Sequence, residues 1–134
     1  GRHEALLSEL RVDQFIDYAK RAPEDVVRDV DLVVDAVGGE KTGRFLQTLK
    51  RGGALFPIYP LGFSGTDEAE RLGVTVSATQ VRSNGAQLAE AGRLLDNGTI
   101  RVVIDSSYPL AEARKAHERA AQGHIQGKIV LTVE

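Results

Sequence analysis

Few residues in this sequence have the type and spacing that chemistry at a site requires. It contains no cysteine, which excludes disulfides, thiolate nucleophiles and sulfur-ligated zinc. Its three histidines, His3, His117 and His124, do not fall at metal-ligand spacing. His117 lies on the apolar side of an expected helix, which favours a partly buried structural histidine over a catalytic one. We therefore expect no metal site and name no catalytic residue.

Two glycine-containing segments approach known motifs without matching them. In GGEKTG, Glu40 stands where a phosphate-binding P-loop needs a glycine before its Lys-Thr pair. GFSG around Ser64 is one residue short of the GxSxG nucleophile elbow, so an ordinary loop serine is the favoured interpretation. The GxGxxG loop, whose glycines let the backbone approach a dinucleotide's pyrophosphate, does not occur. No single motif assigns a reaction to the chain.

Two carboxylates, Asp31 and Asp35, flank the most apolar segment, LVV. Their spacing puts both on the same face of a strand. Solvated strand ends explain them more simply than acid–base chemistry. Asp35 remains a candidate supporting residue, because it ends a parallel strand, where open α/β sheets bind ligands.

Composition excludes several partners. The 17 basic residues nearly balance the 19 acidic ones and leave a net charge of -2, so we expect no nucleic-acid partner. No apolar run approaches the roughly 20 residues that cross a bilayer, and the first residues lack a signal-peptide hydrophobic region. The expectation is a cytoplasmic protein with no membrane partner.

Apolar periodicity places these residues on alternating helices and strands, which predicts an α/β fold with a parallel sheet and right-handed crossovers. The consecutive apolar residues of the strand at 31–36 are typical of a strand covered on both faces. The loop over 61–68 follows a strand end, where ligands bind in such sheets. The expected helices are at 3–10, from 23, at 41–51 closed by Gly52 and Gly53, at 87–96 and at 109–122, and the expected strands are at 14–18, 31–36, 54–58, 74–81, 102–104 and 128–133.

Taken in order, the segments FIDY, DLVVDAVGGE, LKRGGALFPIYPLG and YPLAEARKAHERAAQGHIQGKIVLTV resemble the zinc-independent, quinone-oxidoreductase-like branch of the medium-chain dehydrogenase/reductase superfamily. The resemblance implies a partial Rossmann-like parallel sheet with flanking helices, lacking its first two strands and the glycine-rich loop. It implies that residues 1–100 are the C-terminal part of an NADP-binding domain. Residues 101–134 would be the helix and strand that return to the catalytic domain.

The resemblance also implies residues that contact the cofactor's phosphates. Arg2 matches a position where NADP-preferring relatives hold the adenosine 2′-phosphate, which a guanidinium suits. Tyr18 matches a tyrosine near the same phosphate, and an aromatic residue that caps a strand end explains it equally well. Lys128 matches a basic position that reaches the cofactor's phosphates, or is simply a solvated lysine at a strand start.

Two turns complete the implied cofactor site. Ala36, Val37 and Gly38 match the turn beneath the cofactor's ribose, where a glycine lets the main chain come close. Tyr59, Pro60 and Leu61 match the turn beside the nicotinamide. The two turns are expected to meet at one crevice.

The function that the resemblance implies is hydride transfer from NADPH to a quinone or an activated alkene or carbonyl, a small-molecule substrate. The isolated chain is expected to be inactive, because most substrate contacts lie in the family's other domain. Strand edges left without a neighbour invite pairing with another chain, so we expect a homodimer. The alternative is a non-catalytic α/β module for interaction or self-association.

Overall fold

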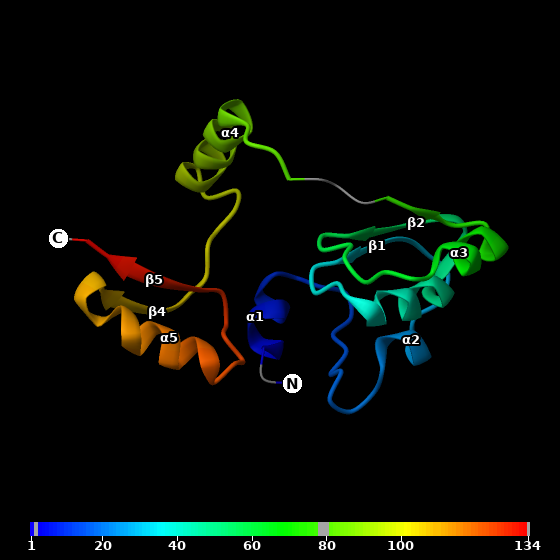
Figure 1. The fold of residues 1–134 in the computed structure, drawn as a ribbon, viewed down its shortest axis with the longest axis horizontal. Helices are drawn as coiled ribbons and strands as arrows, with labels where there is room; N and C mark the ends of the chain where they lie inside the picture. Colours follow the sequence, from blue (N-terminus) through cyan, green and yellow to red (C-terminus); the bar gives the residue numbers. More distant parts are fainter. Residues whose placement is uncertain (2, 78–80, 134) are drawn as a thin grey trace. The chain divides into compact units, whose positions relative to one another are not determined.

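The computed structural model describes residues 1, 3–77 and 81–133, and the chain divides between Val81 and Arg82 into two compact units. Each unit carries parallel strands together with helices (Figure 1). The α/β prediction with parallel strands is therefore confirmed. The elements of the first unit are α1 (Glu4–Glu9), α2 (Pro23–Val26), β1 (Val30–Asp35), the 3₁₀ helix η1 (Glu40–Thr48), β2 (Leu49–Pro57), α3 (Thr66–Leu72) and β3 (Thr75–Val76).

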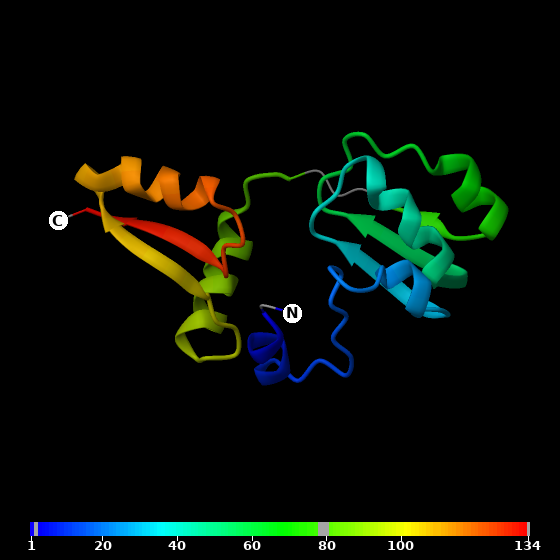
Figure 2. The same ribbon diagram turned by 90° about the horizontal axis from the view of Figure 1, so that it is seen from below.

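The first unit is built on a three-stranded parallel sheet in the order β1-β2-β3. Val33 of β1 lies opposite Leu55 of β2, which in turn lies opposite Val76 of β3. Helix η1 contacts both β1 and β2, and it also contacts α2 and α3 (Figure 2). One face of the sheet is thus covered by helices that come from the segments between the strands.

The core of this unit lies between η1, α3 and that face of the sheet. Leu46 of η1 and Leu55 of β2 are almost completely buried, and removing such side chains from water stabilises a fold by about 1.5–3 kcal/mol each. Ala69 of α3 and Val74, just before β3, complete the cluster with Leu49. The apolar positions that alternate along β2 therefore hold the helices in place.

The other face of the sheet is not covered, contrary to the expectation for β1. Leu32 is 53% exposed and Val34 is 59% exposed. These two residues pair with Ala54 and Phe56, and paired residues in neighbouring strands point to the same side of a sheet. Their side chains therefore point away from the Val33–Leu55 side, where the buried core lies.

The helix expected at 41–51 ends earlier, at Thr48, and its glycine pair serves another purpose. Gly52 and Gly53 lie inside β2, where Val30 pairs with Leu49 but Leu32 pairs with Ala54, so β2 carries extra residues. Gly52 has φ +82°, a backbone conformation that costs glycine little. The glycine pair thus forms a bulge in a strand instead of a helix cap.

One further expectation was wrong in this unit, and two others hold in part. Residues 14–18 form no strand, because no strand among the described residues lies beside them to complete a hydrogen-bond ladder. The expected loop over 61–68 ends at helix α3, which begins at Thr66 and closes at Gly73 with φ +67°. The strand expected at 74–81 is formed at Thr75–Val76, and residues 78–80 lie outside the described residues.

The second unit contains the two helices that the sequence predicts most clearly. The side chain of Asn84 accepts a hydrogen bond from the Gln87 amide at 3.0 Å and caps the first of them. The strands of this unit pair in parallel, and the segment between them includes the second helix. The elements are α4 (Gly85–Asp96), β4 (Ile104–Pro109), the 3₁₀ turn η2 (Leu110–Glu112), α5 (Ala113–Ala121) and β5 (Lys128–Thr132).

A partly buried ion pair ties the second unit together. Arg119 of α5 donates to the Asp105 carboxylate of β4 at 2.6 Å and to the Gly123 carbonyl at 3.0 Å. The Gln126 amide donates to the same carboxylate at 3.0 Å and is the largest influence that holds the pKa of Asp105 below its ordinary value. These contacts fix the segment between α5 and β5 against β4. The assignment of residues 1–100 and 101–134 to separate family domains remains a prediction.

Candidate functional site

The carboxyl ends of β1 and β2 bring two turns into contact. Because the strands are neighbours and parallel, both chains leave the sheet at the same edge, which is where open α/β sheets bind ligands. A Cβ atom added to Gly38 would lie 2.3 Å from the Tyr59 carbonyl oxygen, so only glycine allows this approach. The Ile58 amide also donates to the Asp35 carbonyl at 2.9 Å. The Ala36–Gly38 and Tyr59–Leu61 turns thus meet, as the sequence predicts.

The carboxylate of Asp35 shapes the first of these turns. Its Oδ1 accepts hydrogen bonds from the Val37 amide at 2.9 Å and the Gly38 amide at 3.0 Å. Its Oδ2 accepts from the Thr42 hydroxyl at 2.6 Å, and both residues are buried. One side chain therefore connects the end of β1, the turn and the start of η1.

This environment keeps Asp35 ionised. Burial raises the pKa of the carboxyl, but the hydrogen bonds from Thr42, Gly38 and Val37 and the positive charge of Arg44 outweigh it. The pKa of Asp35 therefore lies below its ordinary value. A buried carboxylate that already accepts three hydrogen bonds is poorly suited to take a proton from a substrate.

A half-open depression of about 400 Å³ lies beside the turn. Arg44 at its wall forms an ion pair with Glu24 at 3.5 Å and lies over the Phe45 ring, 4.7 Å from its centre. Arg44 is thereby fixed, and its neighbour Lys41 adds a second positive charge. The residues that line the depression are Asp35, Val37, Gly38, Glu40, Lys41, Thr42, Arg44 and Phe45.

The exposed side chains of the two turns are mainly apolar. Val37 is 87% exposed, Leu61 64% and Tyr59 54%. Surfaces of this kind bind the flat, uncharged parts of a ligand, and the missing Cβ of Gly38 lets the two turns lie close together. The arrangement fits contact with the ribose and nicotinamide of a nucleotide. It can bind and orient such a group, and it holds no activated nucleophile.

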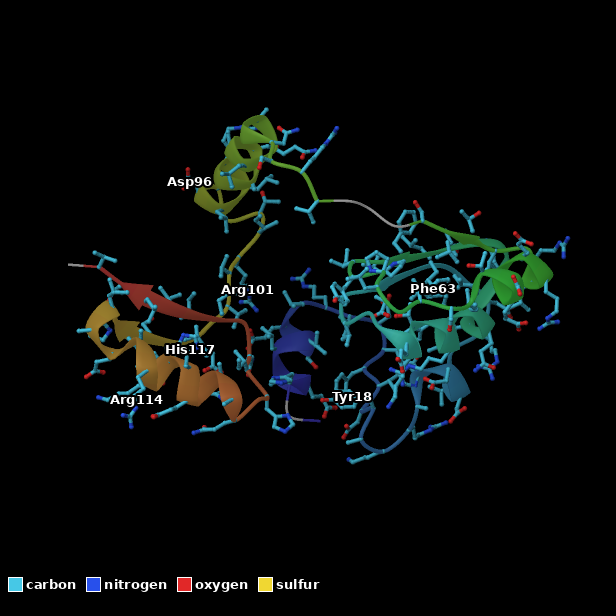
Figure 3. All side chains as sticks on the ribbon, viewed as in Figure 1. Tyr18, Phe63, Asp96, Arg101, Arg114 and His117 are labelled. Carbon is cyan, nitrogen blue, oxygen red and sulfur yellow. The ribbon has the colours of Figure 1, made fainter. Side chains whose placement is uncertain are left out.

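Of the remaining predicted site residues, only two lie within the described residues. Arg2 lies outside them. Tyr18 is 72% exposed on the loop between α1 and α2, so it is not an aromatic residue packed on a strand end (Figure 3). Lys128 is exposed at the start of β5, where its amide donates to the Val103 carbonyl at 2.9 Å. Lys128 belongs to the second unit, and its role in binding a cofactor stays a prediction.

Several site features differ from the sequence-based interpretation. Asp31 is exposed and pairs with Lys50, as expected for a solvated carboxylate, but Asp35 is buried. The sequence indicates Thr42 only as part of an incomplete phosphate loop, whereas in the structure its hydroxyl donates to Asp35. The available signal was a threonine just beyond the Gly-Gly turn that follows a strand-ending aspartate. His117 is exposed on α5, not partly buried.

The described residues contain neither a metal-binding cluster nor a membrane-spanning helix. Among residues 1, 3–77 and 81–133, no group of three or more His, Cys, Asp or Glu side chains is arranged to hold a metal ion. No helix in the same residues is long and apolar enough to span a membrane.

A parallel sheet with helices between its strands and paired turns at its carboxyl edge defines a Rossmann-like fold. Comparison with known proteins agrees: the chain belongs to the zinc-binding dehydrogenase family, whose model matches residues 10–131. This places it in the medium-chain dehydrogenase/reductase superfamily, as the sequence resemblance implies.

Individual relatives support the same placement. The mitochondrial NAD(P)H oxidoreductase RTN4IP1 of Danio rerio is 27% identical over 97% of this chain and 40% of that protein. The quinone oxidoreductase of Mus musculus is 28% identical over 87% of this chain and 38% of that protein. The solved structure of the Coxiella burnetii quinone oxidoreductase matches with a TM-score of 0.85 and 28% identity, covering 99% of this chain and 43% of that one. The chain spans about 40% of the length of the curated relatives it matches.

Proposed function

We propose that this chain is the cofactor-binding C-terminal part of an NADPH-dependent oxidoreductase, which transfers hydride to a quinone or to an activated alkene or carbonyl. The observation that carries the proposal is the contact between Gly38 and Tyr59 at the carboxyl edge of β1 and β2. The relatives named as NAD(P)H and quinone oxidoreductases support the reaction class. NADPH supplies the hydride, and the chain's own residues bind and orient the nucleotide.

Five finer features belong to the same proposal. The reaction needs no zinc, and the protein is cytoplasmic and forms a homodimer. The preference for NADPH over NADH rests on Arg2, whose guanidinium suits a phosphate dianion. The 134-residue chain alone is inactive, because most of the substrate contacts would lie in the other domain of the relatives.

Calorimetric titration of the chain with NADPH tests the proposal. Weak, saturable binding is expected, and Val37→Glu should weaken it at least about threefold by placing a negative charge beside the anionic nucleotide. Val81→Glu is the matched control, because Val81 is 89% exposed and Val37 is 87% exposed. No NADPH binding at millimolar concentration, or equal losses in the two variants, would contradict the proposed site.

The cofactor preference needs a separate comparison. Arg2→Ala should weaken NADPH binding and leave NADH binding unchanged, because only NADPH carries the 2′-phosphate. Arg82→Ala removes an arginine that is exposed and should affect neither cofactor. Equal effects of Arg2→Ala on both cofactors would assign Arg2 another role.

The second candidate function is a non-catalytic interaction or self-association module. The exposed apolar residues Leu32 and Val34 favour it, because apolar side chains that gather on the open face of a sheet are a common contact surface. A chain that self-associates but binds no nicotinamide nucleotide would support this alternative.

A further inference from the structure

We infer, on the basis of the proposed cofactor site, that Asp35 is a positioning residue that fixes the Ala36–Gly38 turn in the conformation that receives the nucleotide. Asp35 is only 6% exposed, so it acts on a ligand through the turn and not by direct contact. Hydride transfer itself does not require a carboxylic acid at position 35.

The hydrogen bonds determine how the turn is held. One carboxylate oxygen accepts from two successive amides, those of Val37 and Gly38, which fixes the direction in which the chain leaves β1. The other oxygen is anchored by Thr42, which is 1% exposed and whose own amide donates to the Gly39 carbonyl at 3.1 Å. The Asp35 carboxylate is therefore fixed through one oxygen by Thr42 of η1, and through the other oxygen it fixes the Val37 and Gly38 amides of the turn.

This arrangement also determines which part of a nucleotide the turn can receive. Backbone amides at turns commonly bind phosphate, but here the amides of Val37 and Gly38 already donate to Asp35. A phosphate at this turn would meet a buried negative charge and would find both amides occupied. The turn instead presents the Val37 side chain, which suits an uncharged ribose or nicotinamide ring.

The position of Tyr59 makes the geometry of the turn critical. Gly38 lies so close to the Tyr59 carbonyl that there is no room for a Cβ atom. A turn released from Asp35 would move relative to Tyr59, and the two halves of the site would no longer match. Errors of about 1 Å in such positions have large effects on bound groups.

Four substitutions separate this role from a purely structural one. Asp35→Ala removes all three hydrogen bonds, whereas Asp35→Asn keeps an oxygen that accepts from Val37 and Gly38. Thr42→Val removes the anchor, whereas Thr42→Ser keeps the hydroxyl. The two readouts are calorimetric Kd values for NADPH and the hydrogen exchange of the Val37 and Gly38 amides, measured by NMR on the folded 134-residue chain.

For Asp35→Ala we expect a loss of NADPH affinity of about tenfold or more and faster exchange of the two amides. Asp35→Asn and Thr42→Ser should remain within about threefold of the wild type in both readouts. A folded Asp35→Ala chain with unchanged Kd and unchanged exchange overturns the inference. If Asp35→Ala does not fold, Thr42→Val takes its place as the test. A Kd for NADPH of Thr42→Val equal to that of Thr42→Ser would then overturn the inference.

The proposed function can fail independently of this inference. A wild-type chain that binds no NADPH contradicts the proposed function. The exchange of the Val37 and Gly38 amides then still shows whether Asp35 holds the turn, because that measurement needs no ligand.

Discussion

Gly38 lies against the carbonyl of Tyr59 so closely that an added methyl group would overlap it, at 2.3 Å. This contact joins the turn after β1 to the turn after β2, and both turns carry residues of the proposed cofactor site. The effect of this steric contact can be separated from the effect of a left-handed backbone. Gly52 in the same unit has a similar φ of +82° but no atom within 4 Å of an added Cβ.

The first prediction concerns the two glycines. Gly52→Ala should reduce the free energy of unfolding by about 1–2 kcal/mol, the cost of a left-handed conformation for alanine. Gly38→Ala should cost roughly 1–3 kcal/mol more, because the methyl group also overlaps Tyr59. Urea unfolding of both variants measures the difference. Equal losses of unfolding free energy in the two variants would show that Tyr59 moves aside without destabilising the fold.

The second prediction is a pH dependence that comes from Asp35. A carboxyl whose pKa is lowered on folding stabilises the fold above its unfolded pKa of about 3.9, and this stability is lost as the pH falls through the folded value. Asp35→Asn cannot ionise, so it lacks this contribution. The free energies of unfolding of wild type and Asp35→Asn should therefore differ most near neutral pH and converge below about pH 4.

Urea unfolding between pH 3 and pH 7 measures both curves. Asp105, whose pKa is also lowered, is present in both proteins, so its contribution cancels in the difference. A difference between the two proteins that stays constant from pH 7 to pH 3 would show that Asp35 gains nothing from ionisation in the folded state.

The sequence predicted those parts of the fold that local patterns determine. Helix α4 carries apolar residues at helical spacing, the cap Asn84 and a closing Asn-Gly pair, and it forms where expected. The continuous apolar segment at 31–36 correctly predicts the strand β1, although not its uncovered face, and the contact between the turns at Gly38 and Tyr59 is one that the family resemblance implies. The helix and the strand require little knowledge of distant contacts.

The features that the sequence did not reveal depend on neighbours elsewhere in the chain. Residues 14–18 have the composition of a strand, but a strand needs a hydrogen-bonding partner beside it. Gly52 is compatible with both a helix cap and a bulge, and only the register between Leu32 and Ala54 decides. Asp35 is buried because Thr42 is folded over it, which no pattern of charges in the sequence shows.

The third prediction concerns the ion pair of the second unit. Arg119→Leu leaves the Asp105 carboxylate, 9% exposed, without its cationic partner, and should lower the free energy of unfolding of this unit by more than the loss of a fully exposed pair does. Arg114→Leu is the matched control on the same helix. Arg114 is 89% exposed and pairs with Glu118, so its loss should cost only about 0–0.5 kcal/mol.

Hydrogen exchange followed by mass spectrometry distinguishes the units in that experiment. Protection in β4 and β5 should fall in Arg119→Leu, while protection in β1 and β2 should not change. Similar effects of the two arginine substitutions would mean that the partly buried position of Arg119 gives its ion pair no more stability than an ordinary surface pair has.

The fourth prediction concerns self-association through the uncovered face of the first sheet. Leu32 and Val34 expose apolar side chains on β1, which is an edge strand among the described residues. Exposed apolar edge strands pair with other chains, and a lysine on such a strand opposes the pairing. Light scattering after size-exclusion chromatography should therefore give a mass above 14.5 kDa for the wild type and a lower mass for Val34→Lys.

Val81→Lys introduces the same charge at a valine outside the sheet and should leave the mass unchanged. A wild-type mass of 14.5 kDa at all concentrations would remove the basis for the proposed homodimer. It would show that the chain stays monomeric with the apolar side chains of β1 exposed to water.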